Sequence, residues 1–327
     1  PSYPQSDIAR GTDPAKTRII FANPDSPFLN RATQGQYVPG STFKIAVASA
    51  GLEERAISAQ TTVDSTGGIR IGQWFFPDWK AGGHGRTDVV KALAESVNTF
   101  FYTIAGGMDD ASGIGIEKLT TWARQMGFGE HTGIDLPEEG RGFLPSPSWK
   151  EEVKKEPWYI GDTYHAAIGQ GDVLVTPLQL AVATSVIANG GTRVAPRLID
   201  AIEGPDGSIQ ERMPPMIRSE NVLSPRTIDL VRAGMRSAVT DGSARGLNAL
   251  PVVVSAKTGT AQVGGTDRTH AWVTVFGPSH SADLALVVLL EGAGGGDTFA
   301  VPVAREILAW YFAPEQQGKR AHTVTGP

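Results

Sequence analysis

Apolar residues recur at helical spacing in several stretches of the chain. Between Ser41 and Arg55 they occupy positions 45, 46, 48 and 52, and after Thr87 they occupy positions 89, 90, 93 and 97. Positions 100, 101 and 104 continue the second pattern. Because residues three and four apart share one side of an α-helix, these patterns predict buried helices, with Thr87 as the cap of the second.

Capping residues predict two more helices, and an apolar pattern predicts a third. Thr176–Pro177 and Ser224–Pro225 each join a capping side chain to a proline of the first turn, and Gly190–Gly191 ends the first of these two helices. Residues 299–312 have the pattern of a closing helix. The first 40 residues are rich in turn formers, so we expect them to be irregular.

Strand-like runs cluster late in the chain, at 251–256, 271–276 and 284–290. The short loops that join these runs favour antiparallel neighbours. Helices in the middle of the chain and a sheet near its end predict an α/β fold, in which helices pack on an antiparallel sheet.

Composition narrows the possible functions. Hydrophobic residues make up 40% of the 327 residues, which is enough for a sizeable core, and the net charge of −5 argues against nucleic acid as a partner. The absence of cysteine excludes disulfides and thiol catalysis. No apolar run reaches the roughly 18 residues of a membrane span, and the residues after Pro1 lack the pattern of a signal peptide.

Three short motifs carry the candidate chemistry. They are S-x-x-K at Ser41–Lys44, S-x-N at Ser96–Asn98, and K-T-G at Lys257–Gly259, which Thr260 follows. Each motif occurs by chance in unrelated chains. Their joint occurrence in this order is typical of penicillin-binding proteins and serine β-lactamases.

The first motif supplies a nucleophile and its base. A serine hydroxyl is a weak nucleophile that needs a neighbouring base, and Lys44 lies one helical turn from Ser41. A lysine acts as a base near neutral pH only when burial or a second cation lowers its pKa, and Lys257 could be that cation. A helix that starts at Ser41 would also present backbone N–H groups to a developing oxyanion.

The third motif suits the edge of a strand. Gly259 has no side chain, so a substrate backbone can lie close against it. Lys257, Thr258 and Thr260 would then offer a cation and two hydroxyls to a substrate carboxylate.

The sequence around these motifs resembles class B penicillin-binding proteins, which are monofunctional transpeptidases. The resemblance spans residues 1–312 and rests on the segments 30–44, 167–171, 174–180 and 270–272. Four groups of residues are most similar to the cell-elongation type: 78–80, 83–85, 144–149 and 156–162. The implied fold is that of the transpeptidase domains and serine β-lactamases, an antiparallel sheet flanked by helices.

The resemblance implies a role for each residue of the first two motifs. Ser41 would attack a D-Ala-D-Ala peptide and become acylated, with Lys44 as its base. Ser96 would relay a proton to the leaving group, and Asn98 would bind the substrate amide. The implied activity is the cross-linking of peptidoglycan by a D,D-transpeptidase that β-lactams inhibit covalently.

The resemblance also implies roles for residues of the K-T-G strand. Lys257 would polarise Ser96, while Thr258 and Thr260 would hold the terminal carboxylate of the substrate. The backbone N–H groups of Ser41 and Thr260 would form the oxyanion hole.

The resemblance further implies the surroundings of the domain. We expect a transpeptidase domain at 1–312 and a polar tail at 313–327. Members of this class carry a membrane anchor, a pedestal and two sheet strands ahead of the segment that starts here at Pro1, so we expect the native chain to continue upstream. The implied partners are peptidoglycan stem peptides, β-lactam antibiotics and a glycosyltransferase of the elongation machinery, outside the cell membrane. No cofactor is expected.

Three related functions use the same motifs. A serine β-lactamase hydrolyses its acyl-enzyme quickly, a β-lactam sensor uses acylation as a signal, and a D,D-carboxypeptidase differs only in the acceptor. The residues before Ser41, the S-x-N motif and the segment Gly169–Gly171 favour the transpeptidase. The amide of Gln170 cannot take a proton, which the base of a β-lactamase must do.

Some elongation-type relatives hold zinc through two aspartates, a histidine and a cysteine inside S-x-N. Here Asp64, Asp78 and His84 could supply three ligands, but Val97 stands at the cysteine position. A structural zinc normally needs four protein ligands, so we expect no tightly bound metal.

Histidines and aromatic residues offer weaker signals. His165, His270 and His280 could belong to a Ser-His-Asp triad, but the lysine of S-x-x-K favours structural or surface roles for them. The aromatic group formed by Trp74, Phe75, Phe76 and Trp79 could be a contact surface, although we expect a packed loop.

Overall fold

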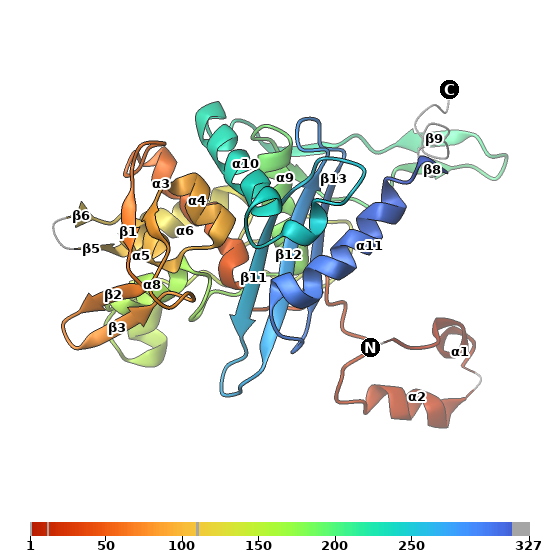
Figure 1. Ribbon diagram of the computed structural model, residues 1–327. Coiled ribbons are helices and arrows are strands. Elements are labelled where there is room, and N and C mark those ends of the chain that lie inside the picture. Colours follow the sequence, from red (N-terminus) through yellow and green to blue (C-terminus); the bar gives the residue numbers. More distant parts are fainter. Residues whose placement is uncertain (1, 12, 109–110, 316–327) are drawn as a thin grey trace.

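A three-stranded antiparallel sheet forms the centre of the protein (Figure 1). The computed structural model describes residues 2–11, 13–108 and 111–315. The strands are β11 (Ser255–Gln262), β12 (Thr269–Gly277) and β13 (Leu284–Leu290), with β12 in the middle. In register, Lys257 lies opposite Thr274 of β12.

Helices and short hairpins surround this sheet. The α-helices are α1 (Gln5–Arg10), α2 (Pro14–Phe21), α3 (Lys44–Glu53), α4 (Val89–Glu95), α5 (Asn98–Gly106), α6 (Gly115–Gln125), α7 (Pro147–Trp149), α8 (Ile160–Ala167), α9 (Pro177–Ala188), α10 (Pro225–Thr240) and α11 (Val301–Tyr311). The shorter turns are η1 (Gly40–Phe43), η2 (Lys150–Lys154), η3 (Arg245–Leu247) and η4 (Gly296–Ala300).

The remaining strands pair as five two-stranded antiparallel units. These are β1 (Val63–Ser65) with β4 (Gly85–Thr87), β2 (Gly68–Ile71) with β3 (Trp74–Pro77), β5 (Gly107–Met108) with β6 (Ala111–Ser112), β7 (Arg193–Ala195) with β10 (Met216–Ser219), and β8 (Ala201–Glu203) with β9 (Ile209–Arg212). No helix among the described residues is both long enough and apolar enough to cross a membrane.

Side chains of β12 alternate between two cores, as the period of a strand requires. Trp272 and Phe276 belong to a large cluster that includes buried residues of α3, α5, α6 and α9. Val273 and Val275 belong to a second cluster, which includes the buried side of α11. The sheet therefore separates two helical layers, and Figure 1 shows α3 to α6 gathered on the side of β11 that is away from α11. This confirms the predicted α/β class.

Two of the predicted helix starts are confirmed. The hydroxyl of Thr176 accepts a hydrogen bond from the N–H of Gln179 at 3.1 Å and caps α9. Ser224 caps α10 in the same way. The third start is wrong by one residue, because Asp88 caps α4 and Thr87 ends β4 instead.

Other boundaries also differ from prediction. The first 40 residues are not wholly irregular, since they contain α1 and α2. The first sheet strand begins at Ser255 and not at residue 251, and it extends through the polar K-T-G segment. The sequence placed K-T-G at the edge of a strand, but the predicted apolar run overlaps β11 only at residues 255 and 256, because polar residues buried on both sides of β11 replace the usual alternation. The closing helix starts at Val301, after the η4 turn.

The expected truncation and the expected polar tail stay predictions. Within the described residues the central sheet has three strands, where the resemblance implies five. Of the predicted tail at 313–327, residues 316–327 lie outside the described part of the chain.

Replacing Trp272 by alanine should destabilise the fold strongly. The side chain is fully buried between helices and sheet, and its indole N–H donates to the Val38 carbonyl at 3.1 Å. We expect the free energy of unfolding to fall by about 3–5 kcal/mol. Trp310→Ala is the control, because that side chain is 63% exposed and its loss should cost about 0.5 kcal/mol or less. Equal effects in urea unfolding would contradict the assigned core.

Candidate active site

Ser41 lies in a tight turn just before a helix. The turn η1 carries it, and α3 begins only at Lys44, three residues after the predicted start. The Lys44 side chain is fully buried, with its ammonium nitrogen 5.2 Å from the centre of the Phe101 ring. The local fold therefore leaves Ser41 at the surface of a cleft and places its predicted base in the core.

Glycines let the η1 turn lie directly against the K-T-G strand. A Cβ on Gly259 would be 2.9 Å from Cγ2 of Thr42, and a Cβ on Gly40 would be 2.6 Å from the carbonyl oxygen of Thr260. Gly40 also has a φ of 54°, in the left-handed region that favours glycine. The neighbour that requires glycine at 259 is thus the protein's own turn, whereas the sequence suggested a substrate backbone.

The S-x-N motif breaks a helix that the apolar pattern predicts to continue. α4 ends at Glu95, and Ser96 takes the left-handed conformation with a φ of 61° before α5 begins at Asn98. The break directs the Ser96 hydroxyl toward two lysines. Its Oγ accepts hydrogen bonds from Lys257 Nζ at 2.9 Å and from Lys44 Nζ at 3.3 Å.

Lys44 is bound to the S-x-N segment. Its Nζ donates to the Ser96 carbonyl at 2.8 Å and to Oδ1 of Asn98 at 2.6 Å. Hydrogen bonds from the Ser41 hydroxyl are not found in the part of the chain that the structure describes. The fold therefore joins Lys44, Ser96, Asn98 and Lys257 in one network, with Ser41 lining the adjoining cleft. Catalytic hydrogen bonds often form only in a substrate complex.

Burial makes both lysines unusually weak bases for their residue type. It lowers the pKa of Lys44 to about 7, although the nearby Asp78 carboxylate acts in the opposite direction. Burial, and then the charge of Lys44, lower the pKa of Lys257 well below its ordinary value. Near neutral pH, Lys44 can therefore exist in part as a free amine, which is the form that accepts a proton.

Asp78 anchors the segment that holds Lys44. One oxygen of its carboxylate accepts from the N–H of Asn98 at 3.1 Å, and the other accepts from the N–H of Thr99 at 2.9 Å. Burial alone would raise the pKa of Asp78, but the hydrogen bonds of Thr99 and Asn98 and the charge of Lys44 lower it overall. The anion thus fixes the start of α5 and balances part of the buried positive charge.

The K-T-G hydroxyls face neighbours on two sides. Oγ1 of Thr258 lies 2.5 Å from Oγ of Ser243, and Oγ1 of Thr260 accepts from the N–H of Gly296 at 3.2 Å. Thr258, Thr260 and Ser243 line a cleft of about 340 Å³ together with Ser41. Six lining residues were absent from the predicted site set: Trp79, Glu95, Ile168, Gln170, Ser243 and Asp297.

The expected packing of the aromatic group is wrong for most of its members. Trp74, Phe75 and Trp79 are all more than half exposed. Only Phe76 turns inward, against the ring of Tyr164 at 4.9 Å. Trp79 instead borders the Ser41 cleft, and its indole N–H donates to the Glu95 carbonyl at 3.0 Å.

The histidines do not form a triad with Ser41, because the cleft lining contains none of the three candidates. His270 accepts a hydrogen bond from the N–H of Gly292 at 3.2 Å, and the ring of His165 packs against Phe76. His280 is exposed. The predicted structural or surface roles fit these positions.

Two of the residues considered for zinc, Asp78 and His84, contact other groups of the site, although Nε2 of His84 has no hydrogen-bond partner in the described part of the chain. Nδ1 of His84 lies 2.7 Å from Oε2 of Glu95, and Nε2 lies 3.6 Å from Asp78. Val97 brings no ligating atom to this cluster. Among the described residues no group of three or more His, Asp or Glu side chains is placed so that it could hold a metal ion. This set does not fit a four-ligand zinc, and the expectation of no tightly bound metal stays a prediction.

Known proteins are similar to this chain in sequence. "Peptidoglycan D,D-transpeptidase MrdA" of Haemophilus influenzae is 34% identical over 338 residues, which cover 95% of this chain and 50% of the relative. The chain therefore spans about half the length of the curated relatives that it matches. This relative supports the predicted similarity to the cell-elongation type.

Solved structures agree in fold. "Penicillin-Binding Protein (PBP2) from Helicobacter pylori" matches with a TM-score of 0.79 and 31% identity, covering 92% of this chain and 54% of that one. A structure titled "Structural coordination of polymerization and crosslinking by a peptidoglycan synthase complex" matches with a TM-score of 0.82 and 35% identity, covering 92% of this chain and 50% of that one. The family model of the penicillin binding protein transpeptidase domain matches residues 2–309, and the chain belongs to that family.

Proposed function

We propose that this domain is a serine D,D-transpeptidase that cross-links peptidoglycan stem peptides through an acyl-enzyme on Ser41. The observation that carries the proposal is the meeting of Lys44 and Lys257 at the Ser96 hydroxyl, next to a cleft that Ser41 lines. A buried lysine with a lowered pKa is the base that a serine nucleophile needs.

In the first half-reaction, Oγ of Ser41 attacks the carbonyl carbon of the penultimate D-alanine. Its proton moves to the neutral amine of Lys44. Ser96 then passes its hydroxyl proton to the nitrogen of the leaving D-alanine and takes up the proton held by Lys44, whose Nζ lies 3.3 Å from Oγ of Ser96. The C–N bond breaks, and an ester joins the donor peptide to Ser41.

In the second half-reaction, an amine of a neighbouring stem peptide attacks the ester. The amine loses a proton through the same relay, the ester C–O bond breaks, and Ser41 recovers its hydroxyl proton. The product is a peptide cross-link. The relay can run in both directions because burial brings the pKa of Lys44 to about 7.

Substrate binding uses the K-T-G strand. Thr258 and Thr260 line the cleft and present hydroxyls to the terminal carboxylate of the donor, near the positive charge of Lys257. Asn98 would bind the amide of the donor peptide. We assign the oxyanion hole to the backbone N–H groups of Ser41 and Thr260, which would stabilise charge on the attacked carbonyl.

We place this domain at residues 1–312, on the outer side of a cell membrane where peptidoglycan lies. The likeness to a chain in a complex for polymerization and crosslinking supports a glycosyltransferase as partner. β-Lactams, which present a reactive amide in place of D-Ala-D-Ala, should acylate the same serine.

Penicillin should label Ser41 and no other residue. Peptide mapping of the adduct should place the mass increase on the peptide that contains Ser41. Ser41→Ala should abolish labelling, and Lys44→Ala should slow it by about a thousandfold or more, because nucleophile and base act as a unit. Ser185→Ala is a control outside the cleft and should label at the normal rate. A label on Ser96 or any other serine would refute the assignment.

The penicillin adduct should persist for many minutes after free drug is removed. A transpeptidase must keep its ester until an amine arrives, and the nearby Gln170 side chain is an amide that donates to the Thr260 carbonyl at 3.4 Å. An amide does not activate water as a base. Intact-mass measurements over time follow the adduct directly. Loss within seconds, with turnover of penicillin, would make the protein a β-lactamase instead.

Acylation should slow as pH falls below about 7. The neutral form of Lys44 is the active base, and its pKa is about 7, so its fraction falls about tenfold for each further pH unit. The second-order rate constant for penicillin should therefore rise with pH and level off above neutrality. Stopped-flow acylation with a fluorescent penicillin measures this profile. A constant rate between pH 5 and 8 would exclude Lys44 as the base.

A further inference from the structure

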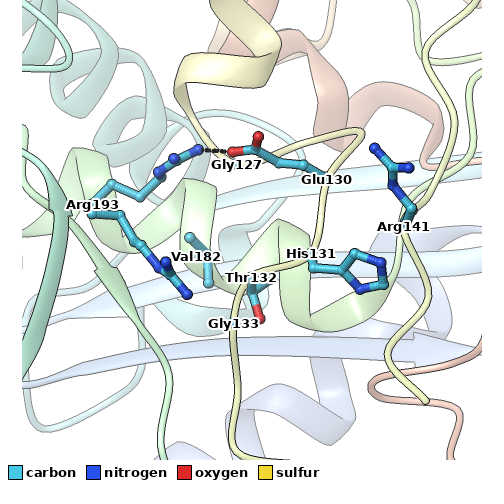
Figure 2. Close-up of a pocket in the computed structure, with 9 residues that line it drawn as sticks. Gly127, Glu130, His131, Thr132, Gly133, Arg141, Val182 and Arg193 are labelled. Atoms are coloured by element: carbon cyan, nitrogen blue, oxygen red, sulfur yellow. Dashed lines mark hydrogen bonds and ion pairs between the residues drawn. The ribbon is translucent and has the colours of Figure 1, made fainter. Parts of the chain in front are cut away.

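A second cavity, also about 340 Å³, shares no lining residue with the Ser41 cleft. Its walls come from the loop after α6, the segment before residue 143, α9, β7 and β10, and Figure 2 shows the side chains that line it. Three arginines line it: Arg141, Arg193 and Arg218. Arg193 and Arg218 are more than 50 positions away from Arg141 in the chain, so the fold brings these charges together.

Acidic groups offset only part of this charge. Arg193 pairs with Glu130 through one guanidinium nitrogen, which also donates to the Arg124 carbonyl at 2.9 Å. In the part of the chain that the structure describes, neither Arg141 nor Arg218 has a carboxylate within ion-pair distance.

The other carboxylate near the cavity, Glu139, is committed to the loop backbone. It accepts from the N–H of Thr132 at 2.7 Å and from the N–H of Gly133 at 3.1 Å. It also lies 3.9 Å from Nδ1 of His131. Three arginines and two glutamates leave one net positive charge, beside the imidazole of His131.

Two buried polar atoms of the lining lack a partner. They are Nε of Arg193 and Oγ1 of Thr132. A buried donor without an acceptor is unfavourable, so such atoms call for an explanation. An oxygen-rich anion in this cavity would supply acceptors to both.

The loop after α6 leaves space for the side chain of Arg218 beside Gly133. Gly133 has a φ of 85°, and a Cβ on it would collide with the guanidinium of Arg218. The Gln179 side chain joins two segments of the wall, because its Nε2 donates to the carbonyls of Glu130 and Arg141 at 2.7 Å each. The protein's own contacts thus hold parts of the cavity wall in place, which lowers the entropic cost of binding.

We propose that this cavity binds a phosphate group. Guanidinium groups on several wall segments of one cavity suit a tetrahedral anion with three or four oxygens, whereas one fork satisfies a planar carboxylate. A phosphate group with one or two negative charges also matches the small net positive charge of the site. The proposal is independent of the catalytic function, because the two cavities share no residue.

Titration calorimetry with inorganic phosphate and pyrophosphate, at constant ionic strength, tests this proposal on the whole chain. We expect saturable binding that Arg141→Ala/Arg218→Ala weakens by at least about tenfold, because each arginine contributes a charge-assisted hydrogen bond. Gly133→Ala should weaken binding too, through displacement of Arg218. Arg226→Ala/Arg305→Ala removes the same charge outside the cavity and should bind normally. Penicillin labelling confirms that each variant is folded.

A second arm identifies the source of the phosphate. If the protein sediments with phosphatidylglycerol vesicles and the arginine double variant does not, the ligand is a lipid headgroup. Binding of free phosphate without sedimentation would indicate a soluble phosphate group, and both results support the site. Absence of saturable binding in both arms, or binding that the double variant leaves unchanged, would overturn the proposal. Acetate binding as tight as phosphate would overturn the assignment to phosphate.

Discussion

Two lysine side chains are buried around one serine hydroxyl, and most of the site follows from this constraint. Removing an ammonium group from water costs several kcal/mol unless other polar groups replace the lost hydration. Here the Ser96 carbonyl and the Asn98 side chain accept hydrogen bonds from Lys44, while the Thr258 carbonyl accepts one from Lys257. The uncompensated remainder of that cost lowers the pKa of both lysines. Burial, which is unfavourable for the fold, thereby leaves part of Lys44 as the free amine that an acyl transfer requires near neutral pH.

The backbone around the lysines is arranged to keep them in place. Ser96 must turn its hydroxyl and its carbonyl toward Lys44 at once, which a continuous helix would not allow, so the chain breaks there in a left-handed conformation. The carboxylate of Asp78 accepts hydrogen bonds from the N–H groups at the start of α5 and supplies a negative charge near Lys44. The same carboxylate therefore acts on geometry and on the proton affinity of the base.

Close packing of the η1 turn on β11 brings the distant parts of the site together. Glycines at 40 and 259 allow the backbones to touch, and a methyl group at either position would meet atoms that have little room to move. Contact between these segments places Ser41 on one cleft with Thr258 and Thr260, although more than 200 positions separate Ser41 from these two threonines. The opposite side of the sheet contributes stability through the cluster around α11.

The sequence by itself determined the three motifs, the α/β class and the capped helices α9 and α10, because these depend on near neighbours in the chain. A hydroxyl next to a lysine at i+3 and a cap followed by proline are local patterns. The bounds of the polar strand β11, the helix break at Ser96 and the presence of Ser243 and Asp297 in the cleft were decided only by the tertiary structure. β11 is a strand because β12 pairs with it, and Ser243 joins the site because β11 packs on α10. The lowered pKa values of Lys44 and Lys257 also depend on the tertiary structure, since burial is a property of the whole packed core and of no single segment.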